Sequence, residues 1–344
     1  MNKILNFKKK NDSVKIIFEN NITNKYLKKI SLKHNKIFCF VDSKVKGYVY
    51  KSKAISNINF FYINCNESIK NFKYYERFSN KLILNGIDRN SVIICIGGGT
   101  LGDLTGFISS TILRGIKFIL IPTTFLSQID SSIGGKNGIN SKYGKNLIGT
   151  FYQPSEIVID TNFLKTLPKR EIKSGYSEVL KHALIYDEKF FYWLEKNYEK
   201  IFNLNKKILE NTILKSILIK LYYVKNDTKE KLINSKSRAM LNFGHSIGHA
   251  LEAIYKYKNK LNHGEAISIG MLVESHISYK LGFMSKVDLI SIKNHFNKAN
   301  LKVFDKNLKS KNLLRHLIKD KKNMDGKINL VLLKKIGTPI INKE

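Results

Sequence analysis

The sequence predicts an α/β N-terminal domain with a Rossmann-like parallel sheet, followed by a mainly α-helical C-terminal domain. In the first half, short apolar runs alternate with helical stretches, and in the second half long helical periodicities replace them. Length is a further indication, because 344 residues exceed the size at which one hydrophobic core usually stops growing. We therefore expect two domains, covering residues 1–168 and 169–344.

The expected sheet rests on runs that are uniformly apolar rather than alternating. Such runs are typical of parallel strands that are covered on both faces. The expected strands are Ile37–Val41, Phe60–Ile63, Val92–Ile96, Phe118–Ile121 and Ile157–Ile159. Because open α/β sheets bind ligands at the carboxyl ends of their strands, the residues that follow these runs are the first candidates for a binding site.

The second half has the apolar period of helices from about Arg170 onward. The expected helices are Glu171–Ile185, Lys189–Phe202 and Ile208–Val224. No proline interrupts this half before Pro339. The domain boundary is placed near Pro168, whose ring disfavours the continuation of a helix from the residues before it.

The formal charge of +33 is the unusual bulk property of the chain. Taken alone, it would favour nucleic acid, an anionic membrane surface or an anionic substrate as the partner. Lysines are scattered through every segment without a dense arm or tail, which is typical of a solvated surface. We therefore expect no nucleic-acid partner, and we interpret the charge as a drift in overall composition.

The cysteines and the apolar segments indicate where the protein works. Cys39, Cys65 and Cys95 are widely spaced and form no C-x-x-C pair, so neither a disulfide framework nor a thiolate metal site is expected. No stretch of about 18 successive apolar residues occurs, and no apolar run of signal-peptide length follows the charged start. We expect a cytoplasmic protein with no membrane partner.

A glycine-rich turn follows the expected strand Val92–Ile96. It reads Gly97-Gly98-Gly99-Thr100-Leu101-Gly102-Asp103 and matches the pattern G-x-G-x-x-G. Glycines let the backbone approach a pyrophosphate, whose charge the amide groups and the helix dipole stabilise. A tight turn without a ligand would give the same pattern. No acidic residue lies about 20 positions later, where a standard Rossmann site holds the ribose, so the turn predicts an atypical dinucleotide site.

A second polar group of residues lies after the next expected strand. Threonine hydroxyls and lysines beside glycine turns can hold phosphate oxygens through charge-assisted hydrogen bonds. The residues are Thr123, Thr124, Asp130, Gly134, Gly135, Lys136, Lys145 and Asn146. Asp130 could orient a lysine or a sugar hydroxyl. The alternative is a glycine-rich connection with ordinary surface lysines, which we favour for Lys145 alone but not for the whole group.

Histidines gather in the second half of the chain. His245 and His249 lie four residues apart, on one face if the segment is helical, and His263 follows. This grouping indicates a divalent-metal site of the zinc type, although a single histidine is more often a satisfied core residue. No glutamate follows His245, so the pattern is not H-E-x-x-H. A carboxylate can complete such a site, and Glu178, which shares a helix face with Lys181, is the best candidate; an ordinary surface ion pair is the alternative.

Several ordered motifs together resemble the 3-dehydroquinate synthase family of the sugar-phosphate cyclase superfamily. The similarity runs from about residue 92 to residue 284. The motifs are Gly97–Phe107, Ser127–Lys136, Gly144–Gly149, Ser177–Lys181 and Asn242–His249. Chance similarity does not give so specific a set in one order.

The resemblance implies a carbon–oxygen lyase of the shikimate pathway, which leads to the aromatic amino acids. Members of the family convert 3-deoxy-D-arabino-heptulosonate 7-phosphate into 3-dehydroquinate and phosphate. NAD acts catalytically: the C5 hydroxyl is oxidised, phosphate is eliminated, the ketone is reduced again, and an intramolecular aldol step closes the ring. The resemblance also implies a bound Zn²⁺, with Co²⁺ as an alternative, and a homodimer.

The resemblance further implies a role for individual residues. The residues that match the zinc ligands are Glu178, His245 and His263. Those for the substrate phosphate are Lys136, Asn146, His249 and Arg114, the last reaching in from the partner subunit. Those for the substrate carboxylate and hydroxyls are Arg238, Lys220, Asp130, Lys181 and Asn242. The NAD-binding positions are Asp42, Glu67, Lys70, Gly99, Thr100, Leu101, Gly102, Asp103, Thr123, Thr124, Lys136, Lys145, Phe163, Leu164, Lys165 and Thr166.

The chain departs from the family pattern in places. The lysine-rich segment Thr228–Ser237 replaces a short acidic stretch, which makes Lys225 an alternative to Lys220. The segment Cys65–Lys70 keeps only its glutamate and its lysine. Among enzymes, the alternatives are another sugar-phosphate cyclase and a metal-dependent polyol dehydrogenase. Outside enzymes, the alternative is a basic nucleic-acid-binding protein.

Overall fold

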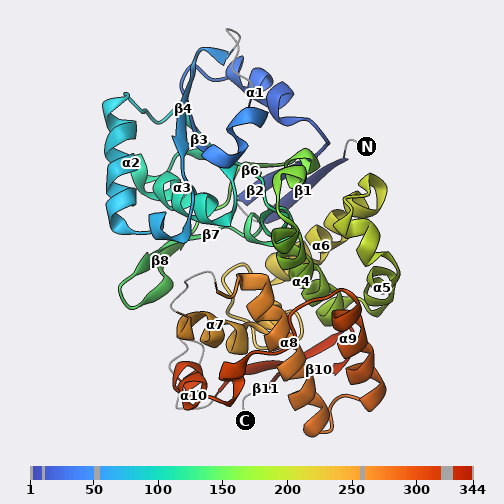
Figure 1. Cartoon of the computed structure of the whole chain (residues 1–344). Helices are drawn as coiled ribbons and strands as arrows, with labels where there is room; N and C mark the ends of the chain where they lie inside the picture. Colours follow the sequence, from blue (N-terminus) through green and yellow to red (C-terminus); the bar gives the residue numbers. More distant parts are fainter. Residues whose placement is uncertain (1–2, 10–11, 50–54, 256–259, 319–327, 343–344) are drawn as a thin grey trace. The chain divides into compact units, whose positions relative to one another are not determined.

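The computed structural model describes residues 3–9, 12–49, 55–255, 260–318 and 328–342. The chain folds as two compact units, Met1–Pro168 and Lys169–Glu344 (Figure 1). The first unit is built on a parallel β-sheet, and the second is built mainly on helices. This architecture confirms the predicted fold class.

The first unit is organised around a seven-stranded sheet. Its strands are β1 (Lys3–Lys9), β2 (Asp12–Phe18), β3 (Ile37–Asp42), β4 (Ile58–Ile63), β5 (Val92–Gly97), β6 (Lys117–Pro122) and β9 (Glu156–Ile159). The order is β1-β2-β9-β6-β5-β3-β4, and the neighbouring strands are parallel except for the antiparallel pair β1 and β2. β5 is buried along its whole length, which explains why its sequence does not alternate.

Helices cover both faces of this sheet (Figure 1). They are α1 (Thr23–Ser31), α2 (Phe72–Leu84) and α3 (Gly99–Thr111). Leu27 of α1 belongs to one hydrophobic cluster with Cys39 and Val158 of the sheet. Phe78 of α2 and Leu104 of α3 belong to the cluster on the opposite face. Successive residues of β3, β5 and β6 thus belong to different clusters, as the alternation of side chains along a strand requires.

The strand order reverses between β3 and β5. From β3 the chain passes outward to β4 at the edge of the sheet, and it then returns to β5 on the other side of β3. In open α/β sheets, ligands bind at the carboxyl ends of the strands at such a switch point. Asp42 is the last residue of β3 and Gly97 is the last residue of β5. The glycine-rich turn therefore lies where the topology favours a ligand.

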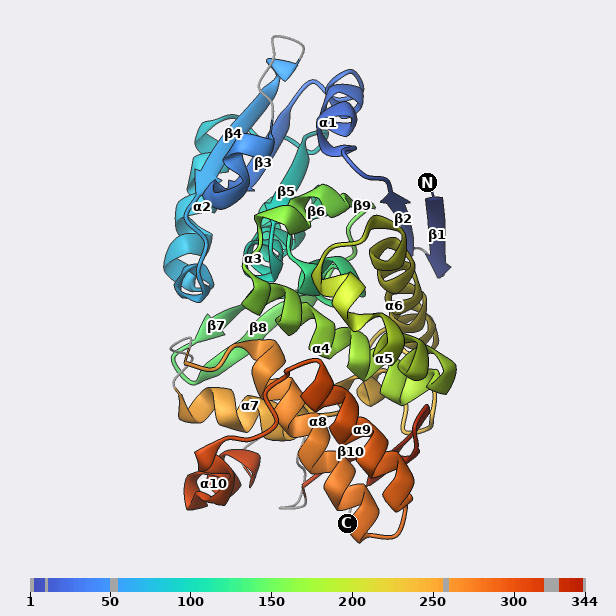
Figure 2. The same cartoon turned by 45° about the vertical axis from the view of Figure 1, so that its right-hand side comes forward.

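A separate hairpin belongs to the first unit, formed by β7 (Lys136–Ser141) and β8 (Gly144–Phe151) (Figure 2). Lys136 and Lys145 lie on its strands, so this glycine-rich segment is a regular hairpin rather than an irregular connection. Gly138 pairs with Gly149, and a Cβ at Gly138 would lie 2.6 Å from the carbonyl oxygen of Ile148. The glycines therefore allow the two strands to approach closely.

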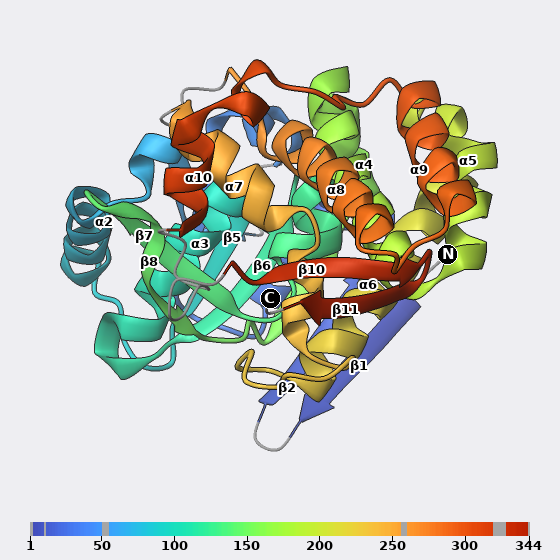
Figure 3. The same ribbon diagram turned by 90° about the horizontal axis from the view of Figure 1, so that it is seen from below.

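The second unit is mainly helical, as predicted. Its helices are α4 (Lys169–Tyr186), α5 (Glu188–Phe202), α6 (Lys206–Asn226), α7 (His245–Ile254), α8 (His263–Lys280), α9 (Lys286–Lys298) and α10 (Lys311–Ile318). A two-stranded ribbon, β10 (Leu330–Lys335) and β11 (Thr338–Asn342), runs beside α8 and was not predicted (Figure 3). Within the part of the chain that the structure describes, none of the helices combines the length and apolar character that a membrane span requires.

A glycine seam joins α7 to α8, formed by Gly244, Gly248 and Gly270. Gly244 begins α7 with a φ of 78°, and a Cβ there would lie 2.8 Å from the carbonyl oxygen of Ile267. A Cβ at Gly270 would overlap the carbonyl oxygen of Gly244. The Gly244 N–H also donates to the Glu274 carboxylate at 2.6 Å. The backbones of the two helices therefore lie side by side at close range (Figures 2 and 3).

A buried histidine fills the packing of α4, α5 and α9. Nε2 of His295 lies 2.9 Å from the hydroxyl of Tyr176, and its ring centroid is 4.9 Å from that of Phe191. Burial lowers the pKa of His295 to about 4; Glu195 opposes this shift and Lys298 adds to it. The folded protein therefore holds His295 in its neutral form at neutral pH.

We expect His295 to make the second unit sensitive to acid. The unfolded chain takes up this proton near pH 6.5, whereas the folded chain does so only near pH 4, so the stabilising contribution is complete above pH 6.5 and is lost as the pH falls. By pH 4.5 the loss amounts to about 2.5 kcal/mol of unfolding free energy. Urea unfolding of the wild type and of His295→Gln at pH 7 and 4.5, with chelator present, measures it. An equal loss in both proteins would contradict the assignment.

Candidate metal and nucleotide sites

The three expected metal ligands meet in the second unit: Glu178 of α4, His245 of α7 and His263 of α8. Nε2 of His245 lies 3.6 Å, and Nε2 of His263 lies 3.5 Å, from the same oxygen, Oε1 of Glu178. A tetrahedral zinc ion with ligand bonds of about 2.0–2.1 Å holds its ligand atoms about 3.4 Å apart. The distances from the Glu178 oxygen to both histidine nitrogens therefore fit zinc, and the three donor atoms lie within 4.8 Å of one another.

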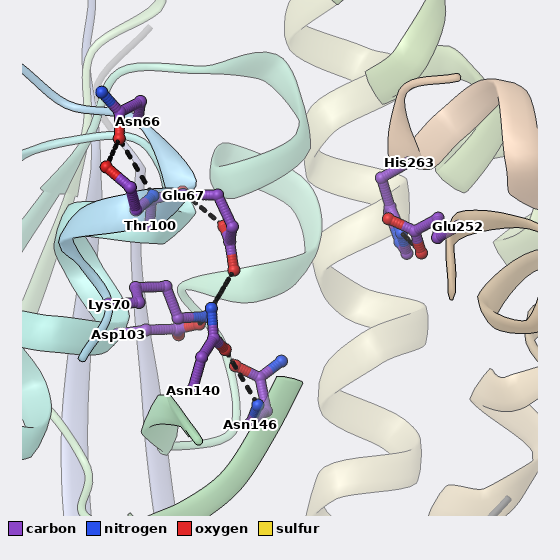
Figure 4. Close-up of polar contacts among 10 residues, drawn as sticks. Asn66, Glu67, Lys70, Thr100, Asp103, Asn140, Asn146, Glu252 and His263 are labelled. Atoms are coloured by element: carbon purple, nitrogen blue, oxygen red, sulfur yellow. Dashed lines mark hydrogen bonds and ion pairs between the residues drawn. The ribbon is translucent and has the colours of Figure 1, made fainter. Parts of the chain in front are cut away.

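In both histidines the second ring nitrogen, Nδ1, also has a hydrogen-bond partner. Nδ1 of His245 lies 3.1 Å from the carbonyl oxygen of Phe243, and Nδ1 of His263 lies 3.2 Å from Oε2 of Glu252 (Figure 4). When Nδ1–H donates to these oxygens, Nε2 carries the lone pair and faces Glu178. Metal-ligating histidines are commonly fixed in this way, by a second hydrogen bond that sets the tautomer.

The electrostatics around the cluster favour a bound cation. Burial would lower the pKa of His263, but the carboxylates of Glu252 and Glu178 raise it to about 10. This position therefore stabilises positive charge, which a divalent cation supplies. For His245, burial together with the ammonium of Lys181 lowers the pKa well below its usual value, so its imidazole is neutral, as a metal ligand must be.

The pair formed by Glu178 and Lys181 is deeply buried. Glu178 is 0% exposed and Lys181 is 1% exposed, and their charged groups are in direct contact. The alternative of an ordinary surface ion pair is therefore wrong. Burying two charged groups costs free energy unless neighbouring groups compensate the loss of hydration. Because the imidazoles of His245 and His263 lie beside this pair, we interpret it as part of a polar site and not as a salt bridge that stabilises the fold.

His249 lies one turn after His245 on α7. Its ring centroid is 5.2 Å from that of His245 and 6.0 Å from that of His263. With Glu252 and His263 it forms a second group whose donor atoms lie within 4.8 Å of one another. We favour the group of Glu178, His245 and His263 as the metal site. In that group, Nε2 of both histidines faces Oε1 of Glu178, and Nδ1 of both is left for a hydrogen bond.

The two residues expected to bind a carboxylate are both buried in the second unit. Lys220 on α6 is 7% exposed, whereas Lys225 on the same helix is exposed, which favours Lys220. Arg238 is 3% exposed, and its guanidinium donates to the carbonyl oxygen of Thr228 at 2.9 Å. A buried guanidinium and a buried ammonium interact with an anion more strongly than exposed ones do.

Two acidic residues that the sequence pattern did not single out, Asp227 and Glu230, organise the lysine-rich segment Thr228–Ser237. The buried carboxylate of Asp227 accepts hydrogen bonds from the backbone N–H groups of Lys231 at 2.8 Å and Arg238 at 3.1 Å. Oε1 of Glu230 accepts a hydrogen bond from Nδ2 of Asn242 at 2.7 Å. The sequence does not single out either acid, because their role depends on how the loop folds around the Asp227 carboxylate.

In the first unit, the glycine-rich turn leaves little room for side chains. A Cβ at Gly98 would lie 2.9 Å from Cγ2 of Thr124, and one at Gly99 would lie 2.9 Å from the hydroxyl of Ser131. Gly98 caps α3, so the amide groups of the first helical turn lie at the switch point of the sheet. The N–H of Thr123 donates to the carbonyl oxygen of Gly97 at 3.0 Å, which places the threonines beside the turn.

Four of the expected NAD-binding residues form one polar network beside this turn (Figure 4). The hydroxyl of Thr100 donates to Oε2 of Glu67 at 3.2 Å. Nζ of Lys70 lies 2.7 Å from Oδ2 of Asp103 and 3.8 Å from Oε1 of Glu67. The side chain of Asp42 accepts the N–H of Lys44, where it begins a short helical turn. Leu101 and Gly102 are buried in α3.

The remaining expected residues of the first unit do not all join this network. Phe163 and Leu164 are buried, so their side chains support the fold, whereas Lys165 is exposed. Thr166 bonds back to the carbonyl oxygen of Phe163 at 2.7 Å. Asp130 is half-buried in the turn Ser127–Ser131.

Arg114 lies at the other end of α3 from the glycine-rich turn. Because a helix rises about 1.5 Å per residue, the two ends of this 13-residue helix are roughly 20 Å apart. Arg114 has a φ of 69° and follows Leu113, whose φ is 48°, in an exposed turn. Within one chain, therefore, Arg114 does not meet the nucleotide-binding residues at the start of α3.

The chain matches the descriptions of one family along most of its length. The family descriptions 3-dehydroquinate synthase N-terminal and 3-dehydroquinate synthase C-terminal match residues 60–174 and 175–323. The 3-dehydroquinate synthase of Pelagibacter ubique is 45% identical over 336 residues, which cover 94% of this chain and 90% of that protein.

Two solved structures have the same fold. The 2-epi-5-epi-valiolone synthase of Streptomyces hygroscopicus, with NAD⁺ and Zn²⁺ bound, has a TM-score of 0.86 at 23% identity and covers 98% of this chain and 94% of its own. A 2-deoxy-scyllo-inosose synthase with carbaglucose-6-phosphate, NAD⁺ and Co²⁺ has a TM-score of 0.84 at 24% identity and covers 99% of this chain and 94% of its own. The matching family descriptions and the identity to the Pelagibacter protein mean that the chain belongs to the 3-dehydroquinate synthase family.

Proposed function

We propose that this chain converts 3-deoxy-D-arabino-heptulosonate 7-phosphate into 3-dehydroquinate and phosphate. The observation that carries this proposal is the meeting of Glu178, His245 and His263, with Oε1 of Glu178 3.5–3.6 Å from Nε2 of both histidines, in a member of the 3-dehydroquinate synthase family. Family membership supplies the substrate class. The cluster supplies the metal site that this chemistry needs.

We propose that the first unit binds NAD and the second binds the metal. The polar network of Glu67, Lys70 and Asp103 at the switch point supports the first assignment, and the zinc-sized cluster supports the second. The bound NAD⁺ and Zn²⁺ or Co²⁺ of the two cyclase structures agree with both. When bound, the metal would polarise the C5 oxygen, and NAD would take a hydride from C5 and return it later.

The residues of the chain bind and orient the substrate in this proposal. Lys220 and Arg238 hold its carboxylate, where their burial strengthens the interaction. Asp130, Lys181 and Asn242 contact hydroxyl groups; the hydrogen bond from Asn242 to Glu230 fixes the orientation of its amide.

Phosphate elimination does not require a strong base from the protein in this proposal. A ketone at C5 makes the neighbouring C6 proton acidic, so the substrate's own phosphate can accept it. Lys136, Asn146 and His249 therefore need only hold the phosphate near that proton and stabilise its charge as it leaves. This explains how the site can act without a dedicated strong base.

The decisive experiment is incubation of the purified chain with the heptulosonate phosphate, NAD and Zn²⁺. We expect phosphate and 3-dehydroquinate to appear in equal amounts while total NAD⁺ stays constant, and we expect a chelator to stop the reaction. Net NADH formation from a polyol would identify a dehydrogenase instead. Turnover only of another sugar phosphate would identify a different cyclase, and salt-sensitive binding of nucleic acid without turnover would identify the basic binding protein.

We further propose a homodimer in which Arg114 of the partner subunit completes the phosphate site. Arg114 lies in an exposed turn, roughly 20 Å along α3 from the nucleotide end, where a partner subunit can reach it.

Mixing two inactive variants tests this dimer. Arg114→Ala and Lys136→Ala are each expected to lose most activity. After the subunits are exchanged, about half of the dimers are mixed, and each of these has one intact site, so about one quarter of wild-type activity should return. No recovery after verified subunit exchange would show that Arg114 acts within its own chain.

A further inference from the structure

Lys70 occupies a buried position between three elements of the first unit. It follows the turn Glu67–Ile69 and is 4% exposed. Its ammonium lies 2.7 Å from Oδ2 of Asp103 on α3 and 2.5 Å from Oδ1 of Asn146 on β8 (Figure 4). Burial would lower the pKa of Lys70, but the carboxylates of Asp103 and Glu67 raise it, so the ammonium stays charged. The Lys70 ammonium therefore links the hairpin to the polar network of Glu67, Thr100 and Asp103 beside the glycine-rich turn, which we call the nucleotide network.

Asn140 on β7 makes a second link between the same elements. Its backbone N–H donates to the carbonyl oxygen of Lys70 at 2.7 Å. Its Nδ2 donates to Oε1 of Glu67 at 2.8 Å, and its Oδ1 accepts the backbone N–H of Asn146 at 3.0 Å (Figure 4). The side chain of Asn140 thus contacts a nucleotide-network residue and a phosphate-site residue at the same time. Nothing in the sequence pattern had assigned it a role.

These contacts determine how Asn146 is presented. Its φ of 54° lies in the left-handed region, which costs free energy for a residue with a side chain. The bond from its N–H to Asn140 stabilises this backbone, and the ammonium of Lys70 fixes Oδ1. An ammonium group can only donate hydrogen bonds, so it pairs with the oxygen of an amide and not with its NH₂ group. The Nδ2 donors of Asn146 are therefore directed away from Lys70 and suit an anion.

We propose that Asn140 is a positioning residue that, together with Lys70, sets Asn146 for the substrate phosphate and couples the phosphate site to the nucleotide network. The proposal rests on the proposed function. Asn140 does not touch the substrate; it acts through Asn146. Since the contact between Asn146 and phosphate exists in the ground state and during elimination, its loss weakens binding more than it slows the chemical step.

The test compares Asn140→Ala with Thr150→Val. Thr150 lies on β8 of the same hairpin, and its hydroxyl donates to Ser110 of α3 at 3.0 Å, so Thr150→Val removes a contact of the hairpin that does not involve Asn146. For Asn140→Ala we expect KM for the heptulosonate phosphate to rise about tenfold with kcat changed less than about threefold. Thr150→Val should leave both values within about twofold of the wild type.

Binding of inorganic phosphate, followed by calorimetry or by phosphorus NMR, gives a readout that does not need turnover. Asn140→Ala should weaken it by a similar factor, while NAD affinity changes less because Thr100 still holds Glu67. Unchanged phosphate affinity in Asn140→Ala, or an equal loss in Thr150→Val, would overturn the proposal. If the wild type failed to turn over the heptulosonate phosphate, the proposed function would fail, but the phosphate comparison would still decide the role of Asn140.

Discussion

Replacing Glu178 by glutamine is expected to lower turnover by at least about a thousandfold, with the chain still folded. The amide keeps the shape of the carboxylate but removes the negative charge that His245 and His263 face at 3.5–3.6 Å. Losing one of three protein ligands also weakens metal binding. A loss of roughly 4 kcal/mol in the stabilisation of charge on the substrate oxygen corresponds to the expected factor. His245→Ala should have the same effect.

Metal content and activity must be measured together to interpret these variants. Dialysed Glu178→Gln and His245→Ala should contain much less zinc than the wild type, with unchanged far-ultraviolet circular dichroism. His276→Ala is the matched control, because His276 lies on α8, the helix that begins at His263, and its Nδ1 lies 3.0 Å from the backbone carbonyl oxygen of Leu272, away from the cluster of ligands. It should keep its zinc and its activity. Full activity in a zinc-stripped Glu178→Gln sample would exclude Glu178 as a ligand.

Replacing Gly270 by alanine is expected to destabilise the second unit by about 3 kcal/mol or more. The added methyl group would overlap the carbonyl oxygen of Gly244 and lie 2.8 Å from its carbonyl carbon. Both neighbours are backbone atoms, so no side-chain movement can relieve the overlap. The helices would have to separate, which also moves His245 away from His263.

Thermal unfolding measures this cost directly. For a unit of this size, about 3 kcal/mol corresponds to a fall in Tm of roughly 6–12 °C. Gly47→Ala is the control, since a Cβ at Gly47 has no heavy atom within 4 Å and its φ is not positive. That variant should unfold within about 2 °C of the wild type. An unchanged Tm for Gly270→Ala would show that the seam is less tight than the structure indicates.

The sheet could be predicted from the sequence where its strands are buried on both faces. Val92–Gly97 is apolar throughout and buried throughout, so composition and structure agree. The edge strand β1 and its neighbour β2 were missed because polar and charged residues interrupt their apolar residues. The hairpin of β7 and β8 was missed because it is polar and rich in glycine, and its pairing depends on contacts across the turn.

The metal site could be predicted only in part from local spacing. The separation of His245 and His249 predicts a shared helix face, and their ring centroids do lie 5.2 Å apart. However, the ligand set pairs His245 with His263 and with Glu178, which lies on a different helix; the sequence offered Glu178 only as a candidate carboxylate, and the family resemblance assigned it to the metal. Its complete burial and the hydrogen bonds that select the ligand nitrogen depend on tertiary packing, which no local pattern encodes.

The glycine seam has a consequence for how this chain can evolve. The positions of His245 and His263 depend on direct contact between the backbones of α7 and α8, so they depend little on which side chains surround them. Drift of the composition toward lysine, asparagine and isoleucine can therefore replace many surface side chains without moving the metal ligands. Besides the ligands themselves, the positions that such drift cannot change without moving the ligands are the seam glycines, where the only tolerated side chain is a hydrogen atom.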